Sequence, residues 1–206
     1  MALLTPTQMD ALSELGNIGA SHAATTLSQM LMGQIEMTVP LVEVVDLTDI
    51  YKHVTEETAA LSIFQMQGEL DQGGYVIFIM PLSSAIRMTN TMLGMGDEER
   101  ELNEMDESAL NEVGNIMVSA FLDATAELLG VVMLPSPPVL VVDMAHAAIE
   151  QLLAEVAFDV NEVVFFHTKL ICDQYAINGD LVMLPEMNTL SQILELMDEL
   201  LKKHAT

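Results

Sequence analysis

Two twelve-residue stretches decide the architecture expected for this chain: DALSELGNIGAS at Asp10–Ser21 and SALNEVGNIMVS at Ser108–Ser119. The second begins 98 residues after the first (108 − 10 = 98). In each, a glutamate stands four residues and an asparagine seven residues after the start, and a proline follows 23 positions beyond the asparagine. A repeat of about 100 residues is too long for a solenoid, so it indicates one pseudo-symmetric domain made from two halves.

The repeated residues form two equivalent sets. The first set is Asp10, Glu14, Asn17 and Pro40, and the second is Ser108, Glu112, Asn115 and Pro138. A single E-x-x-N pattern carries little information. Two copies with the same flanking residues are a much stronger signal, and they predict two equivalent sites.

The composition fits an acidic protein with a large core. Of 206 residues, 51% are hydrophobic, and 31 acidic against six basic residues give a formal charge of −25. Nucleic-acid binding needs a basic surface to displace counterions, so we expect no nucleic-acid partner. An anionic membrane surface would also repel the chain. Two compatible explanations of the charge stay open: a solvated surface suited to a salt-rich cytoplasm, and steering toward a basic protein partner.

Cysteine content and hydropathy point to a soluble cytoplasmic protein. Cys172 is the single cysteine, so no intrachain disulfide or cysteine-rich metal site is expected. No signal peptide is recognisable, and no apolar run approaches the roughly 18 residues of a membrane span.

Both motif copies are predicted to lie on long helices. Thr5 suits an N-cap, Pro6 the first helical position and Gln8 the capping box. This helix should run to about Met32 and stop at Gly33. Asn103, which is 98 residues after Thr5, should begin a second helix that ends near Gly130.

Helical periodicity places the motif residues on the outer faces. The expected core stripe of the first helix is Met9, Leu12, Ala23, Leu27 and Met30, and that of the second is Leu110, Met117, Phe121 and Leu128. The expected outward ridges are Asp10, Glu14, Asn17 and Ser21 in the first helix, and Ser108, Glu112, Asn115 and Ser119 in the second.

The rest of each half reads as strands followed by an amphipathic helix. Strands are predicted at 36–47, 59–67, 75–80, 138–143, 162–172 and 176–184. Pro81 and Pro185 precede the last helix of each half and are 104 residues apart (185 − 81 = 104), so the second half has about six extra residues. We place them in a helix around 144–158, and we expect the acidic stretch 94–107 to be an exposed connection.

A glutamate and an asparagine three residues apart on a helix can contact one bound group. Asparagine both donates and accepts, so it can hold a water in a chosen orientation, and glutamate can pair with a partner's lysine. The sequence shows no activated Ser-His or Cys-His pair beside them. The pattern therefore suits a hydrolysis in which the partner brings the metal and the labile bond, as a glutamine orients water in GTPases.

The pattern [DS]-x3-E-x2-N-x22-P, in two copies with GNIG at 16–19 and GNIM at 114–117, resembles the CheC-type chemotaxis phosphatase family. The similarity extends to PPVLVVDM at 137–144. The resemblance implies a single α+β domain with pseudo-two-fold symmetry, whose central β-sheet carries two long motif-bearing helices. The domain would span 1–206, with half-repeats at about 5–96 and 103–206.

The resemblance also implies a function. Glu14 and Asn17, and separately Glu112 and Asn115, would dephosphorylate the aspartyl-phosphate of the response regulator CheY, with Asp10 and Ser108 as supporting residues. Mg²⁺ would belong to the regulator, so the chain would need no cofactor or metal of its own. Family members also bind the receptor deamidase CheD. We place that contact near Asp143 and the helix that follows it, although Asp143 could instead cap the end of its strand.

Two rival functions remain. One is a non-catalytic adaptor that binds CheY or CheD, although such an adaptor would tolerate the loss of either asparagine. The other is a metal-dependent hydrolase, which two polar residues per site and no suitably spaced histidine make a poor fit.

Overall fold

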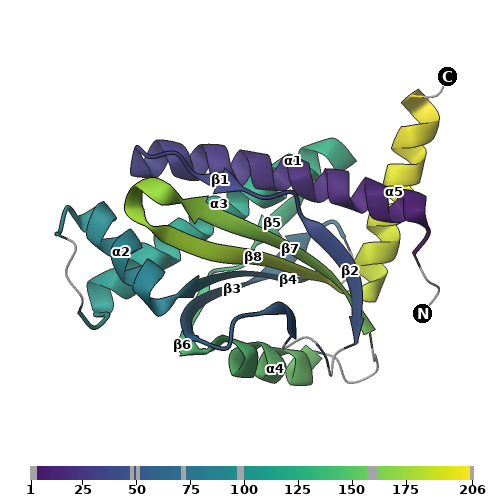
Figure 1. Ribbon diagram of the computed structural model, residues 1–206. Coiled ribbons are helices and arrows are strands. Elements are labelled where there is room, and N and C mark those ends of the chain that lie inside the picture. Colours follow the sequence, from purple (N-terminus) through teal and green to yellow (C-terminus); the bar gives the residue numbers. More distant parts are fainter. Residues whose placement is uncertain are drawn as a thin grey trace.

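A computed structural model of the chain describes residues 4–46, 49, 52–70, 73–96, 100–156 and 162–204. Its centre is an eight-stranded sheet whose strand pairs are antiparallel, with helices on both faces (Figure 1). The elements follow in the order α1 (Pro6–Leu31), β1 (Glu36–Met37), β2 (Leu41–Asp46), β3 (Thr58–Gly68), β4 (Gly74–Pro81), α2 (Leu82–Leu93), α3 (Glu104–Leu129), β5 (Met133–Pro135), β6 (Val139–Met144), α4 (Ala145–Val156), β7 (Glu162–Cys172), β8 (Ile177–Pro185) and α5 (Met187–His204), with a 3₁₀ turn at Asp173–Tyr175.

The two motif helices start and end as equivalent elements. Both α1 and α3 contain 26 residues, and their bounds are offset by 98 at each end (104 − 6 and 129 − 31). Capping boxes at Thr5 and Asn103 begin them, which confirms the predicted starts. Gly130 ends α3 in the left-handed conformation, as expected, but in α1 that position is Met32, with φ 50°, and not Gly33.

The halves exchange strands. Strand β2 of the first half pairs with β7 of the second, whereas β6 of the second half pairs with β3 of the first. The two hairpins, β3–β4 and β7–β8, join through the central pair β4–β8. Neither half could complete its part of the sheet alone, because each lacks the strand that the other contributes.

The strand register preserves the duplication. Leu41 pairs with His167 between β2 and β7. Adding 98 to the first number and subtracting 104 from the second gives Val139 and Ile63, which are a pair between β6 and β3. The two offsets found in the sequence therefore describe one internal two-fold relationship.

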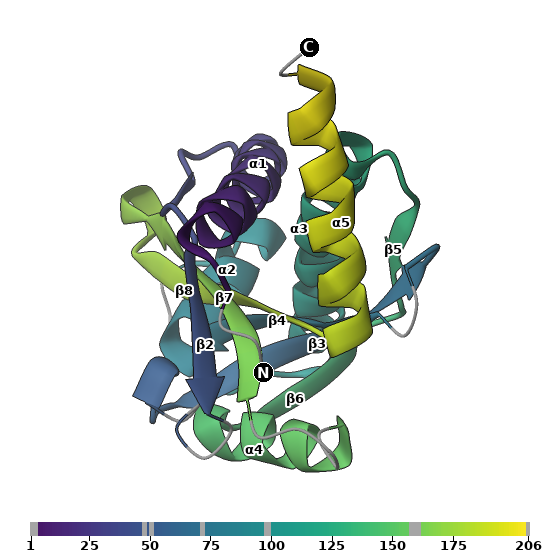
Figure 2. The same cartoon turned by 90° about the vertical axis from the view of Figure 1, so that its right-hand side faces the viewer.

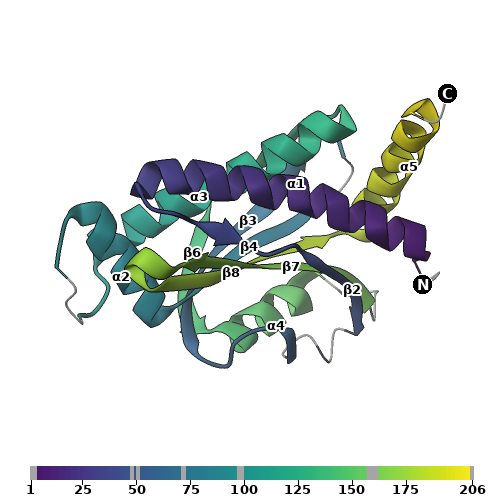
Figure 3. The ribbon, with the colours of Figure 1, turned by 45° about the horizontal axis from the view of Figure 1, so that its top comes forward.

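Two apolar layers cover the two faces of the sheet. The larger lies between the sheet and α1, α2, α3 and α5, and Leu12, Leu27, Phe121 and Phe166 are among its buried members. The smaller lies under α4 and contains Ile149 and Phe165. Figures 2 and 3 show α1 and α3 side by side above the sheet, with α4 on the opposite face.

Three sequence predictions need correction. The expected strand at 36–47 is two strands, β1 and β2, interrupted at 38–40, and Leu47 lies outside the described residues. Short β5 was not predicted, because three residues give no usable period. Leu128 was predicted in the core-facing stripe of its helix, but it is 37% exposed, and Leu129 is buried instead.

The connection between the halves also differs from expectation. Within the stretch predicted as exposed, Arg100 is largely enclosed and Asp106 is fully buried in the first turn of α3. Both guanidinium NH groups of Arg100 donate to the Asp106 carboxylate at 2.5 Å, and Arg100 Nε donates to Asn90 Oδ1 at 2.9 Å. Asp97, Glu98 and Glu99 lie outside the described residues. The acidic run thus contains a buried ion pair that fixes the start of a motif helix.

The predicted helix at 144–158 is α4, over Ala145–Val156, and its last two predicted residues lie outside the described part. Within the described ranges, no helix combines the length and the apolar character needed to cross a membrane.

Candidate functional site

The motif residues face away from the core, as helical periodicity predicted. In α1, Glu14 is exposed and Asn17 half-buried, between the buried residues Leu12, Leu15, Gly16 and Gly19. In α3, Glu112 is exposed and Asn115 half-buried. Each site therefore presents a solvent-exposed carboxylate beside a partly buried amide.

The supporting residues of each ridge are also on the outside. Asp10 and Ser108 are exposed one turn before the glutamates, at corresponding places in α1 and α3. Ser21 is exposed one turn after Asn17, and its counterpart Ser119 is half-buried. The two ridges are therefore open to a partner along about three helical turns.

None of the four central side chains is used by the fold. Among the residues that the structure describes, Glu14, Asn17, Glu112 and Asn115 make no side-chain hydrogen bond and no ion pair. A polar residue that serves helix capping or core satisfaction has such a partner, as Thr5 and Asp106 have here. Their hydrogen-bonding capacity is available to a bound group.

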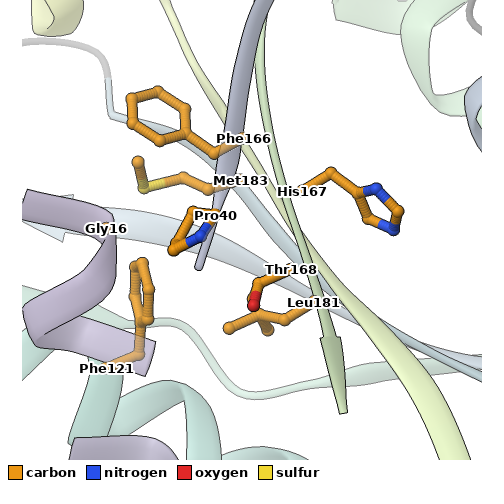
Figure 4. A pocket seen from close by; sticks show the side chains of 8 residues that line it. All are labelled: Gly16, Pro40, Phe121, Phe166, His167, Thr168, Leu181 and Met183. Atoms are coloured by element: carbon orange, nitrogen blue, oxygen red, sulfur yellow. The ribbon is translucent and has the colours of Figure 1, made fainter. Parts of the chain in front are cut away.

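The glycine of the first motif brings its helix against the sheet. A Cβ placed on Gly16 would lie 3.1 Å from Cγ of Pro40 and 3.6 Å from the ring of Phe166. Figure 4 shows Gly16, Pro40 and Phe166 around a cavity of about 10 Å³, enough for about one water molecule. Pro40 thus supports the backbone beneath Asn17 from the residue before β2, in keeping with a role in strand entry.

The second motif uses different packing at the same place. A Cβ on Gly114 would lie 3.1 Å from Cβ of Ser62 and 3.2 Å from Cζ of Phe64, both on β3. The glycine is needed in both copies because the helix backbone approaches a strand closely. In the sequence, these close approaches are marked by the repeated Gly-Asn-Ile at 16–18 and 114–116.

The two helices approach each other at Gly19. A Cβ at Gly19 would be 2.7 Å from the ring of Phe121 and 3.0 Å from Cγ2 of Thr125. Small residues on α1 and large ones on α3 therefore interlock, since the counterpart of Gly19 is Met117 (19 + 98) and that of Ala23 is Phe121 (23 + 98). This contact packs α1 directly against α3, so both ridges lie on the same side of the sheet.

Among the described residues, no cysteine lies beside the Glu-Asn pairs. His22 is exposed on α1, and Cys172 is buried in the main core. Over the described ranges, no group of three or more His, Cys, Asp or Glu residues is placed to hold a metal ion. What the geometry can supply is positioning: an amide to orient a water and a carboxylate to pair with a cation.

Three further polar residues lie outside the two motif helices. Asp143 is exposed at the end of β6, where its Oδ1 accepts a hydrogen bond from the main-chain N–H of Met144 at 2.7 Å. The strand-end cap that we considered is therefore present, and its exposed side chain can still reach a partner. His146 and His167 lie on the α4 side of the molecule and do not join either ridge.

Both motif copies fall within segments that match a known protein family. The profile of the CheC-like family matches residues 8–44 and 105–142, which contain both motif copies. The chain is 30% identical over 194 residues to the CheY-P phosphatase CheC of Bacillus subtilis, covering 90% of this chain and 91% of that protein.

Solved structures share the fold. The crystal structure of Thermotoga maritima FliY matches with a TM-score of 0.78 at 22% identity, covering 96% of this chain and 98% of that one. The CheX–CheY–BeF₃–Mg²⁺ complex of Borrelia burgdorferi matches with a TM-score of 0.55 at 17% identity, covering 86% and 99%. The chain thus shares its fold with FliY and CheX. By its sequence, the chain belongs to the CheC-like family.

Proposed function

We propose that this chain dephosphorylates the aspartyl-phosphate of the chemotaxis response regulator CheY at two sites. Asn17 and Asn115 orient the attacking water, and Glu14 and Glu112 each pair with a lysine of the regulator's active site. The observation that carries this proposal is the pair of outward Glu-Asn sets without internal partners, at equivalent places on two helices of equal length.

The reaction needs little covalent chemistry from this chain. The oxygen of the oriented water attacks phosphorus, the bond from phosphorus to the aspartyl oxygen breaks, and the products are a free aspartate and inorganic phosphate. Positioning the water in line removes an entropic cost from the barrier, and the amide contributes electrostatic stabilisation as charge develops. Mg²⁺ is part of the phosphorylated substrate, as in other phosphoryl transfers.

The similarity to a CheY-P phosphatase supports the choice of substrate. The relative of Bacillus subtilis carries that activity in its name, and the related CheX structure is a complex with CheY. A shared fold by itself does not choose between a phosphatase and an adaptor. Two intact sets of polar residues that the fold does not need favour catalysis.

The test is the decay of phosphorylated CheY, measured with and without this chain in the presence of Mg²⁺. Wild-type protein should accelerate decay, and the double variant Asn17→Ala/Asn115→Ala should lose at least about 100-fold of that acceleration. Gln151→Ala is a matched control, because it removes an exposed amide from α4 on the opposite face of the sheet. Equal acceleration by wild type and double variant would refute the mechanism.

Binding separates the phosphatase from the adaptor. The double variant should bind phosphorylated CheY about as well as wild type, since a neutral amide adds mainly to the transition state. Binding by the wild type without faster decay would instead support the adaptor.

We also propose a contact with the deamidase CheD at the exposed end of β6. Asp143 lies there between Val142 and Met144, each 45% exposed, so a charged residue stands within an apolar edge. Asp143→Lys should abolish co-elution with CheD, while Asp198→Lys, at an exposed aspartate of α5 on the other face of the sheet, should not. Retained co-elution of the Asp143 variant would place the contact elsewhere.

A further inference from the structure

A polar groove of about 530 Å³ lies across the β7–β8 hairpin, bordered by residues 52–55. Its floor includes His167, Lys169 and Asp180. Alternate residues of a strand face the same side, so His167 and Lys169 share the face of Phe165, which packs in the layer under α4. The groove is therefore on the opposite side of the sheet from the two Glu-Asn ridges.

The groove lies where the described parts of the two halves differ, in the segments that follow β2 and β6. In the second half, α4 follows β6, and its buried residues Ala145, Ile149 and Leu153 pack with Leu61 and Ile79 of the β3–β4 hairpin. In the first half, the described residues that follow β2 only border the β7–β8 hairpin. Figure 1 shows that this hairpin extends past α4, so its outer part is left to the groove.

Positive charge is concentrated here in a chain that has little of it. Lys52 and Lys169, two of the six basic residues, line the groove. Lys169 is exposed and makes no side-chain hydrogen bond or ion pair with any described residue. Lys52 is 54% exposed and pairs with Asp49 at 2.7 Å. By contrast, Arg100 is committed to Asp106.

Neutral donors complete the lining. Asn178 Oδ1 accepts from the hydroxyl of Ser84, and the main-chain N–H of Asn178 donates to the same hydroxyl oxygen at 3.1 Å. This fixes the amide so that its NH₂ group is left to donate. Thr55 Oγ1 accepts from the N–H of Glu57 at 3.2 Å, which leaves its own proton for a ligand.

Asp180, the acidic residue in the floor of the groove, pairs with a histidine. Asp180 Oδ1 lies 2.7 Å from His167 Nε2, so its negative charge is directed at the imidazole. His53, also in the lining, lies 3.3 Å from Glu43 through its Nδ1. The side-chain groups of the groove that can bind a ligand are therefore mainly hydrogen-bond donors.

We propose that this groove binds a small anion that carries phosphate groups. Its volume is in the range of small-molecule sites, about 300–1,000 Å³. The ammonium group of Lys169, the oriented amide of Asn178 and the hydroxyl of Thr55 are complementary to phosphate oxygens. A net charge of −25 disfavours an anion over most of the surface, so an anion is expected to bind where basic side chains offset that charge, as Lys169 does in this groove.

Pyrophosphate is the first probe, followed by ATP and by citrate, at constant ionic strength. Binding is followed by amide chemical shifts in ¹⁵N-labelled full-length protein. Pyrophosphate should shift resonances of Lys169, Asn178 and Thr55, and Lys169→Gln should weaken binding about tenfold. Lys202→Gln removes the same charge from the exposed end of α5 and should leave binding unchanged.

The three probes distinguish the sources of the anion. Tighter binding of ATP than of pyrophosphate would assign the groove to a nucleotide, and equal binding would assign it to the phosphate groups alone. Citrate binding as tight as pyrophosphate would overturn the preference for phosphate. No shifts at the groove, or equal loss in the Lys169 and Lys202 variants, would overturn the site. Because the assay contains no CheY, its result is independent of the proposed phosphatase activity.

Discussion

Gly16 and Pro40 are in contact across the boundary between α1 and the sheet: a Cβ on Gly16 would be 3.1 Å from Pro40 Cγ. These are the glycine beside the first asparagine and the proline 23 positions after it (40 − 17 = 23). In the first copy, the spacing of the motif therefore reflects a packing contact beneath the site as well as the polar residues that form it.

Gly16→Ala should destabilise the protein, because the new methyl group would displace the buried ring of Pro40, the residue before β2. We expect a loss of about 1–3 kcal/mol in the free energy of unfolding, measured by urea denaturation. Gly96→Ala is the control, because a Cβ there would meet nothing within 4 Å. A Gly16 variant as stable as the control would show that α1 shifts freely on the sheet.

The helix contact at Gly19 can be tested by a double-mutant cycle. Gly19→Ala should be destabilising alone, because its Cβ would be 2.7 Å from the Phe121 ring, and Phe121→Leu should leave room for it. We expect the cost of Gly19→Ala to fall by about 0.5–3 kcal/mol in the Phe121→Leu background. Strict additivity of the two changes would mean that the ring does not oppose the new methyl group.

The buried ion pair at the start of α3 predicts both a mutational and a pH effect. Arg100→Met leaves the Asp106 carboxylate buried without its main partner and should cost about 3–5 kcal/mol of unfolding free energy. The matched surface change Arg87→Met removes a partly exposed guanidinium that donates to the Ala176 carbonyl and should cost less.

The hydrogen bonds from Arg100 lower the pKa of Asp106 from 3.8 to about 2. A carboxyl whose pKa is lower in the folded state binds fewer protons there, so its stabilisation is complete above the unfolded pKa and is lost as pH falls toward 2. Stability should therefore drop between about pH 4 and pH 2. Arg100→Met should lack this part of the pH dependence; an unchanged profile would assign the acid sensitivity to other carboxyls.

The two proposed sites should differ in their response to salt. Asp123 and Glu127 are exposed on α3, whereas Thr25 and Gln29 hold the corresponding positions on α1 (123 − 98 and 127 − 98). An anionic phosphoryl substrate is repelled more at the second site, and salt screens that repulsion. Asn17→Ala, which leaves only the second site, should gain activity with ionic strength more steeply than Asn115→Ala. Parallel salt profiles would show that these carboxylates do not influence the substrate.

Much of the helical layer could be predicted because its signals are local. The caps at Thr5 and Asn103 and the outward positions of Glu14 and Asn17 follow from short-range hydrogen bonding and a period of 3.6 residues. Leu128 was misplaced because it adjoins Leu129, and periodicity alone did not decide which of two adjacent leucines faces the core at a helix end.

The sheet was harder to predict because strand pairing is a long-range choice. Nothing local in β2 indicates that it pairs with β7 of the other half. The burial of Arg100 could not be predicted either, because an arginine in an acidic loop is expected to be exposed. It is enclosed through its contacts with Asn90 and Asp106.

The duplication, the two capped helices and the two ridges of Glu and Asn could be predicted, since each depends on spacing along the chain. The folded structure was needed to show that strands pair between the halves, that Gly16 and Gly19 seat the helices, and that Lys52 and Lys169 line one groove. Packing and charge clustering depend on residues that are distant in the sequence. Such residues come into contact only when the strands of both halves have paired into one sheet.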